Sequence, residues 1–139
     1  MDSRIFSSLR NKYGLVYGAG SYSALSEDCG FHCVWAKTAK ANIKKVKEVV
    51  DTEIATFLKD GPTDEELKRS YNKYLSGIYS YMETSMGMNS LLTARAFSNL
   101  PPIEENIERA KNITAKDIMT ACKKVFKPEN KKLFCYIPK

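Results

Sequence analysis

Residues 3–25 read SRIFSSLRNKYGLVYGAGSYSAL, and the spacing of the apolar residues changes within this stretch. In its first half the apolar side chains recur at helical intervals, which predicts a short helix over residues 3–13. Gly14 follows at the position where many helices end in a left-handed conformation. From there residues 15–25 are rich in aromatic and β-branched side chains, so the stretch predicts a helix followed by a strand.

A second strand follows at once. Residues 29–38 have the same aromatic and β-branched character. The polar residues Ser26, Glu27 and Asp28 between the two strands form a loop of hairpin length. The sequence therefore predicts two antiparallel strands.

The rest of the chain is mainly helical. Apolar residues at helical spacing, bounded by capping boxes, glycine and proline, predict helices over residues 41–59, 63–82, 85–98, 103–110 and 114–126. We expect the helix over residues 85–98 to be buried. Leu133 to Ile137 has the apolar density of a strand.

This order of elements indicates an α+β fold, an antiparallel β-sheet with helices packed on one face. A chain of 139 residues suits one domain, which we expect to span residues 1–139. Three strands are few for so many apolar helix faces. We therefore expect further strands upstream of Met1, so that the chain is the later part of a larger domain whose uncovered sheet edge favours homo-oligomers.

The formal net charge of +6 comes largely from two lysine-rich regions, Lys37–Lys47 and Lys123–Lys132. A basic excess is one mark of nucleic-acid binding, and a small basic RNA- or DNA-binding module is one hypothesis. The lysines of the first region alternate with apolar residues at helical spacing, as on the solvated face of an amphipathic helix. The strands lack the aromatic pair typical of RNA-binding sheets, so no nucleic-acid partner is expected.

The four cysteines are Cys29, Cys33, Cys122 and Cys135, and they form no close doublets. We expect free, buried thiols, which favour a reducing compartment such as the cytoplasm. His32 is the only histidine, so no metal site is expected in this chain. No apolar run is long enough to cross a membrane, and no membrane partner is expected.

Catalytic patterns are missing as well. The sequence has no H-x-x-E-H motif, and His32 and Cys33 point to opposite faces of a strand. Gly18 and Gly20 are not followed by the third glycine of a dinucleotide-binding turn. We therefore expect no catalytic residue in this chain.

A resemblance to a known family lies in residues 1–22, 61–78 and 108–126, which in this order are similar to the pitrilysin, insulinase and mitochondrial processing peptidase family of zinc metallopeptidases. Residues 1–22, MDSRIFSSLRNKYGLVYGAGSY, are similar to M-S-S-R-L-F-x-x-L-R-x-x-x-G-L-x-Y in the C-terminal homologous domain of that family. Residues 61–78, GPTDEELKRSYNKYLSGI, resemble its later G-x-T-x-E-E-L helix. Residues 108–126, ERAKNITAKDIMTACKKVF, resemble its I-x-x-V-T-x-E-D-I ending.

The resemblance implies that zinc and catalysis belong to another domain of the parent enzyme, and that this chain alone binds no zinc and cleaves nothing. It also implies a role for Arg10 and Tyr17. In the family, an arginine and a tyrosine at this spacing contact the peptide substrate across a central chamber. From spacing alone, Arg10 could equally sit at a helix C-terminus for its charge, and Tyr17 could be a core strand residue.

The leading hypothesis is a non-catalytic C-terminal portion of a zinc-dependent metalloendopeptidase that forms chamber wall and positions peptide substrate. Its expected partners are a catalytic domain or homologous subunit carrying the zinc motif, and the peptide itself. The alternative is a structural or regulatory subunit of the same fold without peptidase activity, because the family also has non-catalytic members.

Overall fold

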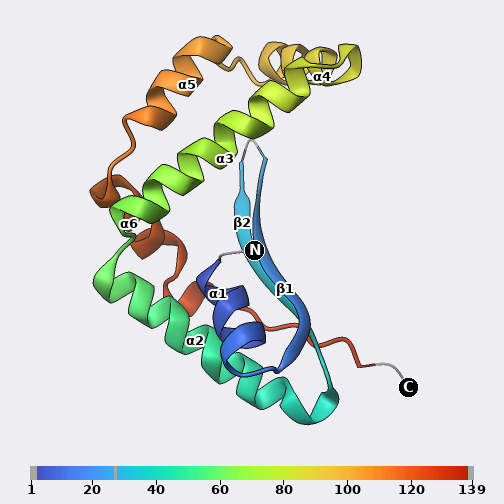
Figure 1. Ribbon diagram of the computed structural model, residues 1–139, viewed down its shortest axis with the longest axis vertical. Coiled ribbons are helices and arrows are strands. Elements are labelled where there is room, and N and C mark those ends of the chain that lie inside the picture. Colours follow the sequence, from blue (N-terminus) through green and yellow to red (C-terminus); the bar gives the residue numbers. More distant parts are fainter. Residues whose placement is uncertain (1–2, 27, 138–139) are drawn as a thin grey trace. The chain divides into compact units, whose positions relative to one another are not determined.

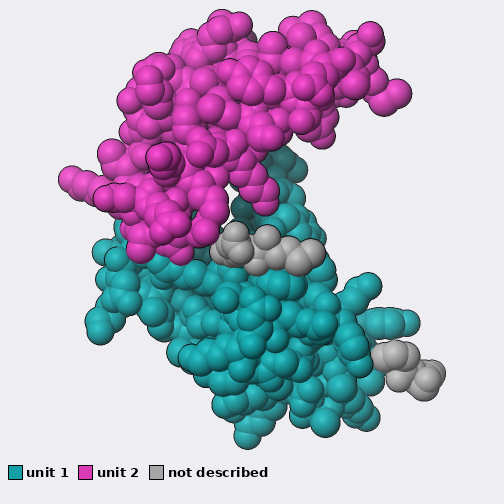
Figure 2. Space-filling view, viewed as in Figure 1, with its two compact units in different colours: residues 1–61, 119–139 teal, residues 62–118 magenta. Residues whose placement is uncertain are grey.

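The computed structural model describes residues 3–26 and 28–137. The chain forms two compact units, one of residues 1–61 and 119–139 and the other of residues 62–118 (Figure 2). Glu27 of the predicted hairpin loop and the first two residues of the quoted family segment lie outside the described residues.

The first unit begins with the predicted helix. This predicted helix consists of a short α-helix, α1 (Arg4–Phe6), and a π-helix, η1 (Ser7–Lys12). The Ser3 side chain caps its start by accepting a hydrogen bond from the backbone N–H of Phe6. Gly14 follows with a φ of +59°, so the predicted left-handed helix end is confirmed.

The two predicted strands form an antiparallel hairpin, β1 (Val16–Leu25) and β2 (Gly30–Thr38), shown in Figure 1. The backbone N–H of Ser26 closes the turn on the carbonyl of Cys29 over 2.8 Å. The pairing is regular from Leu25 opposite Gly30 back to Gly18 opposite Lys37. It then shifts by one residue, because Val16 pairs with Thr38.

One face of this hairpin packs on helices, as predicted. The helix α2 (Ile43–Asp60) follows a turn of 3-10 helix, η2 (Lys40–Asn42), and ends at Gly61. The core of the unit consists of apolar side chains from η1, β1 and α2, namely Leu9, Val16, Val46 and Val49. Ala19 and Ala36 of the hairpin pack against that core, so helices of this unit cover the part of the face that carries these two residues.

Polar contacts fasten α1 and η1 to α2. The Arg4 guanidinium donates to the carbonyl of Gly61 over 2.9 Å and lies over the Phe57 ring. The Ser8 hydroxyl donates to the Glu53 carboxylate over 2.5 Å. These contacts fix the first helical segment before the hairpin begins.

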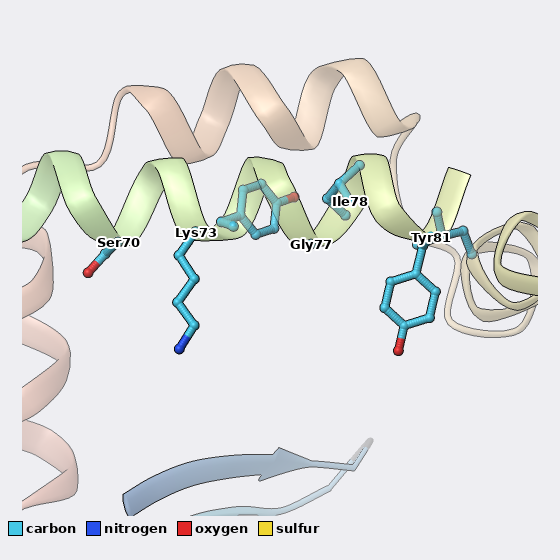
Figure 3. Close-up of a pocket in the computed structure, with 7 residues that line it drawn as sticks. Ser70, Lys73, Gly77, Ile78 and Tyr81 are labelled. Carbon is cyan, nitrogen blue, oxygen red and sulfur yellow. The ribbon is translucent and has the colours of Figure 1, made fainter. Parts of the chain in front are cut away.

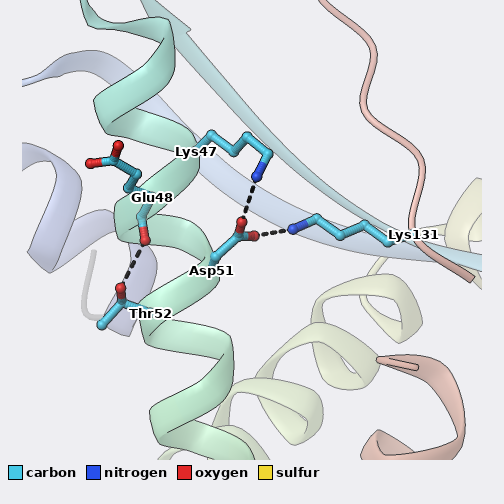
Figure 4. A network of polar contacts seen from close by, with 5 residues as sticks. All are labelled: Lys47, Glu48, Asp51, Thr52 and Lys131. Carbon is cyan, nitrogen blue, oxygen red and sulfur yellow. Dashed lines mark hydrogen bonds and ion pairs between the residues drawn. The ribbon is translucent and has the colours of Figure 1, made fainter. Parts of the chain in front are cut away.

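The last described part of the chain is joined to α2. The helix α6 (Ala115–Val125) is followed by a 3-10 turn, η3 (Pro128–Asn130), and an extended segment. Figure 4 shows the Asp51 carboxylate of α2 accepting hydrogen bonds from Lys47 and Lys131. Lys131 therefore ties the extended segment to α2.

The second unit contains three helices, α3 (Asp64–Met82), α4 (Ser85–Phe97) and α5 (Ile103–Lys111). The predicted capping box starts α3, because Thr63 and Glu66 each accept a hydrogen bond from the other's backbone N–H. Thr114 and Asp117 form the same reciprocal bonds at the start of α6. Both predicted helix starts are confirmed.

Three expectations were wrong. The helix over residues 85–98 forms as α4 but is not buried, since Met86 is 81% and Phe97 84% exposed. The apolar residues of α4 point in several directions at 100° per residue, so packing on α3 cannot cover them all.

Leu133–Ile137 is extended but is not a strand, because no described segment forms a hydrogen-bonded ladder with it. None of the four thiols expected to be buried is fully buried, since Cys29 and Cys135 are exposed and Cys33 and Cys122 are partly buried.

Candidate functional site

The corner between η1 and β1 brings the two predicted site residues into one place. It is anchored by Leu9, which is fully buried, and whose carbonyl accepts a hydrogen bond from the Leu15 backbone N–H over 2.9 Å. The Thr38 hydroxyl of β2 donates to the Leu15 carbonyl over 2.6 Å. The corner is therefore held by one bond within itself and by one from β2.

Arg10 is fixed in this corner by its side chain. It follows Leu9 on the π-helix and is exposed, and its Nη1 donates to the carbonyl of Val16 over 2.7 Å. The guanidinium carries five N–H donors in a rigid fork, so one bond sets its orientation and leaves other donors for a ligand. Localised π-helical turns are frequent at functional sites.

Tyr17 is the extra residue of a β-bulge. Val16 pairs with Thr38 and Gly18 pairs with Lys37, so Tyr17 has no partner residue on β2. Its side chain is 84% exposed, whereas that of the preceding Val16 is 2% exposed. A bulge of this kind redirects a side chain without interrupting the strand. The Tyr17 phenol therefore faces solvent at the point where Arg10 is bonded to the neighbouring residue.

The expectation that Arg10 and Tyr17 lie near one helix-to-strand corner agrees with this geometry. The reading of Tyr17 as a core strand residue does not, because the side chain is exposed. Sequence reasoning missed the bulge and the role of Thr38. A shift in pairing depends on the partner strand, and no local residue pattern signals it.

A shallow groove of about 500 Å³ lies in the second unit (Figure 3). It runs along α3, from Ser70 and Lys73 past Gly77 to Tyr81, and Leu91 of α4 completes it. Its lining includes no carboxylate, histidine or cysteine. Its one charged side chain is Lys73, and its aromatic side chains are Tyr74 and Tyr81.

Other titratable side chains of the described residues are engaged in hydrogen bonds, burial or ring packing. A hydrogen bond with the Cys33 thiol raises the pKa of Tyr22, and burial raises the pKa of the Cys122 thiol. His32 shares a hydrogen bond of 2.9 Å with Ser23 and packs its ring against Phe126.

Among the described residues, no three His, Cys, Asp or Glu side chains gather closely enough to hold a metal ion. In the same part of the chain, no helix has the length and apolar character to span a membrane.

Comparison with known proteins agrees with the fold. The family model described as the peptidase M16 inactive domain matches residues 1–74, which include α1, η1 and the whole hairpin. The chain is 31% identical over 132 residues to an uncharacterized zinc protease of Rickettsia felis. It is 28% identical over 101 residues to the uncharacterized zinc protease YmxG of Bacillus subtilis.

A solved structure gives the same result. The crystal structure of a peptidase M16 inactive domain from Pseudomonas fluorescens matches 90% of this chain with a TM-score of 0.73 and 25% identity. The fold is therefore the α+β fold of that domain.

The chain belongs to the peptidase M16 family and corresponds to its inactive domain. It spans only part of each relative: 31% of the Rickettsia protein, 25% of the Bacillus protein and 30% of the Pseudomonas chain. The relatives are named zinc proteases, and the matched region is the one named inactive.

Proposed function

We propose that this chain is a non-catalytic portion of a zinc-dependent metalloendopeptidase, in which it forms chamber wall and positions peptide substrate through Arg10 and Tyr17. The observation that carries the proposal is the bond from Arg10 to Val16 beside the exposed, bulged Tyr17. It rests also on membership of a zinc protease family. The partner is a catalytic domain that carries the zinc ligands.

Zinc bound in that partner would supply an activated water for attack on a peptide carbonyl. The residues of this chain bind and orient the peptide substrate. The Arg10 guanidinium and the Tyr17 hydroxyl both donate to the substrate backbone near the scissile bond, and both help to hold the carbonyl oxygen that becomes negative as it is attacked. Each donor of this kind is worth about 2.7–4 kcal/mol in the transition state.

The test is cleavage of a fluorogenic peptide by the full protease that contains this chain, with and without substitutions. Arg10→Ala and Tyr17→Phe each lower kcat by about 10²–10³-fold, because each removes one donor. Lys12→Ala is the matched control, since Lys12 is an exposed cation two residues further along the same helix. Circular dichroism of each variant checks that the fold is kept.

Two results would contradict the proposal. If the Arg10→Ala and Tyr17→Phe variants cleave the peptide at the wild-type rate, neither residue positions the substrate. A full protein that cleaves no peptide, yet is required for the activity or stability of a separate protease subunit, would make this chain a structural or regulatory subunit instead.

A further inference from the structure

The hairpin has a second face, turned away from the core that it shares with η1 and α2. Residues directly opposite in an antiparallel pair share a face, and so do residues two apart on one strand. Gly20 is opposite Trp35, Tyr22 is opposite Cys33, and Ala24 is opposite Phe31. We call the face that these six residues share the aromatic face. Ala19 and Ala36, by contrast, pack against the core from the other side.

The bulge adds Tyr17 to the aromatic face. Val16 is in the core and Ala19 packs against the core, so both lie on the helix-covered face. Strict alternation would allow one residue between two side chains of one face, but here there are two, Tyr17 and Gly18. Both therefore lie on the side away from the core. The high exposure of Tyr17 agrees with this assignment.

Glycines give the aromatic face its shape. A Cβ on Gly20 would lie 3.1 Å from Trp35 Nε1, and a Cβ on Gly18 would lie 3.6 Å from the Trp35 ring. The indole therefore lies directly over the backbone of β1, where larger residues at position 20 would displace it. Next to it, the Tyr22 and Phe31 rings pack edge to face with centroids 6.0 Å apart.

These rings are substantially exposed, Trp35 by 43%, Tyr22 by 52% and Phe31 by 58%. Clustered exposed aromatic side chains mark an interaction surface more often than isolated ones do. From Tyr17 to Ala24 the face is about 25 Å long at the rise of a strand, the length of an extended peptide of about eight residues. It starts at the Arg10 and Tyr17 corner and continues away from it.

The charges indicate what kind of peptide fits. Neither β1 nor β2 contains Asp or Glu, and the cation Lys37 stands opposite Gly18 at the corner end. Nothing on these strands would attract a basic peptide, whereas apolar side chains would bury area against the rings.

We propose that the aromatic face is the extended subsite of the Arg10–Tyr17 corner, and that it selects peptide segments with apolar or aromatic side chains. This inference rests on the proposed function, since it takes the peptide substrate as the occupant. Trp35 forms its centre, with Tyr22 and Phe31 as the distal contacts. The face is a specificity determinant and takes no part in the bond cleavage.

Trp35 is the only tryptophan of the chain, so its fluorescence reports directly on this face. The probe is a neutral ten-residue peptide with Phe or Leu at alternate positions, titrated into the full chain. The matched control peptide has Ser at those positions. We expect a saturable blue shift of the Trp35 emission with the apolar peptide, and binding at least tenfold weaker with the serine peptide. Equal responses to both peptides, or no response, would overturn the proposal.

Substitutions locate the binding. Tyr22→Ser and Phe31→Ser each weaken binding of the apolar peptide several-fold, while Tyr136→Ser, a change of an exposed aromatic residue in the extended C-terminal segment, leaves it unchanged. Thermal unfolding of each variant confirms that it is folded. A Trp35 blue shift that grows with protein concentration in the absence of peptide would make the occupant a second copy of the chain, and would overturn the proposal.

Cleavage by the full protease separates this inference from the proposed function. If Phe31→Ser leaves the preference for apolar over serine substrates intact while Arg10→Ala still lowers kcat, the aromatic face is not the subsite although the proposed function stands. If the peptide shifts Trp35 emission but Arg10→Ala and Tyr17→Phe cleave normally, the corner role fails while the face still binds peptide.

Discussion

The Nη1 atom of Arg10 donates a hydrogen bond of 2.7 Å to the carbonyl oxygen of Val16, the residue before the β-bulge. This contact joins the π-helix to the first strand across the Gly14 turn. It orients the guanidinium and at the same time satisfies a backbone carbonyl next to the irregular pairing. Arg10 is therefore a structural residue as well as a candidate ligand-binding residue.

Arg10→Ala should lower the free energy of unfolding by about 1 kcal/mol, because the bond to the Val16 carbonyl is lost. Urea denaturation of the chain measures this, with Lys12→Ala as the control that should differ little from wild type. An Arg10→Ala variant as stable as wild type would show that the Val16 contact is not maintained in solution.

Leu9→Ala should destabilise the first unit by about 2–5 kcal/mol, because Leu9 is fully buried at the centre of its core. Leu25→Ala makes the same chemical change at a side chain that is 86% exposed, so it should change stability by less than about 0.5 kcal/mol. Thermal unfolding of the two variants side by side tests the position of the core. Similar losses for both would contradict it.

Two glycine substitutions should change the free energy of unfolding in opposite directions. Gly14 has a φ of +59°, so Gly14→Ala should cost about 1 kcal/mol, and Gly14→Asn less. Gly77 lies within α3, and a Cβ there would meet no atom within 4 Å, so Gly77→Ala should stabilise the chain by about 0.5–1 kcal/mol. Denaturant titration checks both. Destabilisation by Gly77→Ala would mean that another group occupies the space beside α3.

The Asp51 contacts predict a pH dependence. Partial burial raises the pKa of Asp51, but hydrogen bonds and charge from Lys131 and Lys47 outweigh burial and hold it below its ordinary value of 3.8. Because the folded state favours the ionised carboxylate, this stabilisation is present above the ordinary pKa and is lost as the pH falls through the lowered one. Asp51→Asn should therefore reduce stability at pH 7, by at most about 1 kcal/mol, with a difference that shrinks below about pH 4.

Urea midpoints at several pH values measure that difference. Lys131→Ala should reproduce part of the loss at neutral pH, whereas Lys132→Ala, a change of the adjacent lysine, should not. A difference between wild type and Asp51→Asn that persists undiminished at pH 2 would show that the effect is not electrostatic.

Much of the secondary structure could be predicted because its signals are local. The capping box of Thr63 and Glu66 and the helix end at Gly14 depend on residues a few positions apart. The exposure of α4 and the absence of a strand at Leu133–Ile137 could not be predicted from sequence. Both depend on which distant segments are available as packing or hydrogen-bonding partners.

The candidate site divides in the same way. The resemblance to a zinc protease family pointed to Arg10 and Tyr17, and their spacing placed them at one helix-to-strand corner. The one-residue shift between Val16 and Gly18 exists only relative to the partner strand β2. It could not be read from β1 alone.

The sequence by itself determined the order of helices and hairpin strands, because periodicity, caps and turn residues act over a few positions. It also carried the family membership. Only the tertiary structure decided which hairpin face is covered and which exposes Tyr17, Tyr22, Phe31 and Trp35. The physical reason is that a single shift in strand register moves a side chain from one face of a sheet to the other, and register is fixed by contacts between segments distant in the chain.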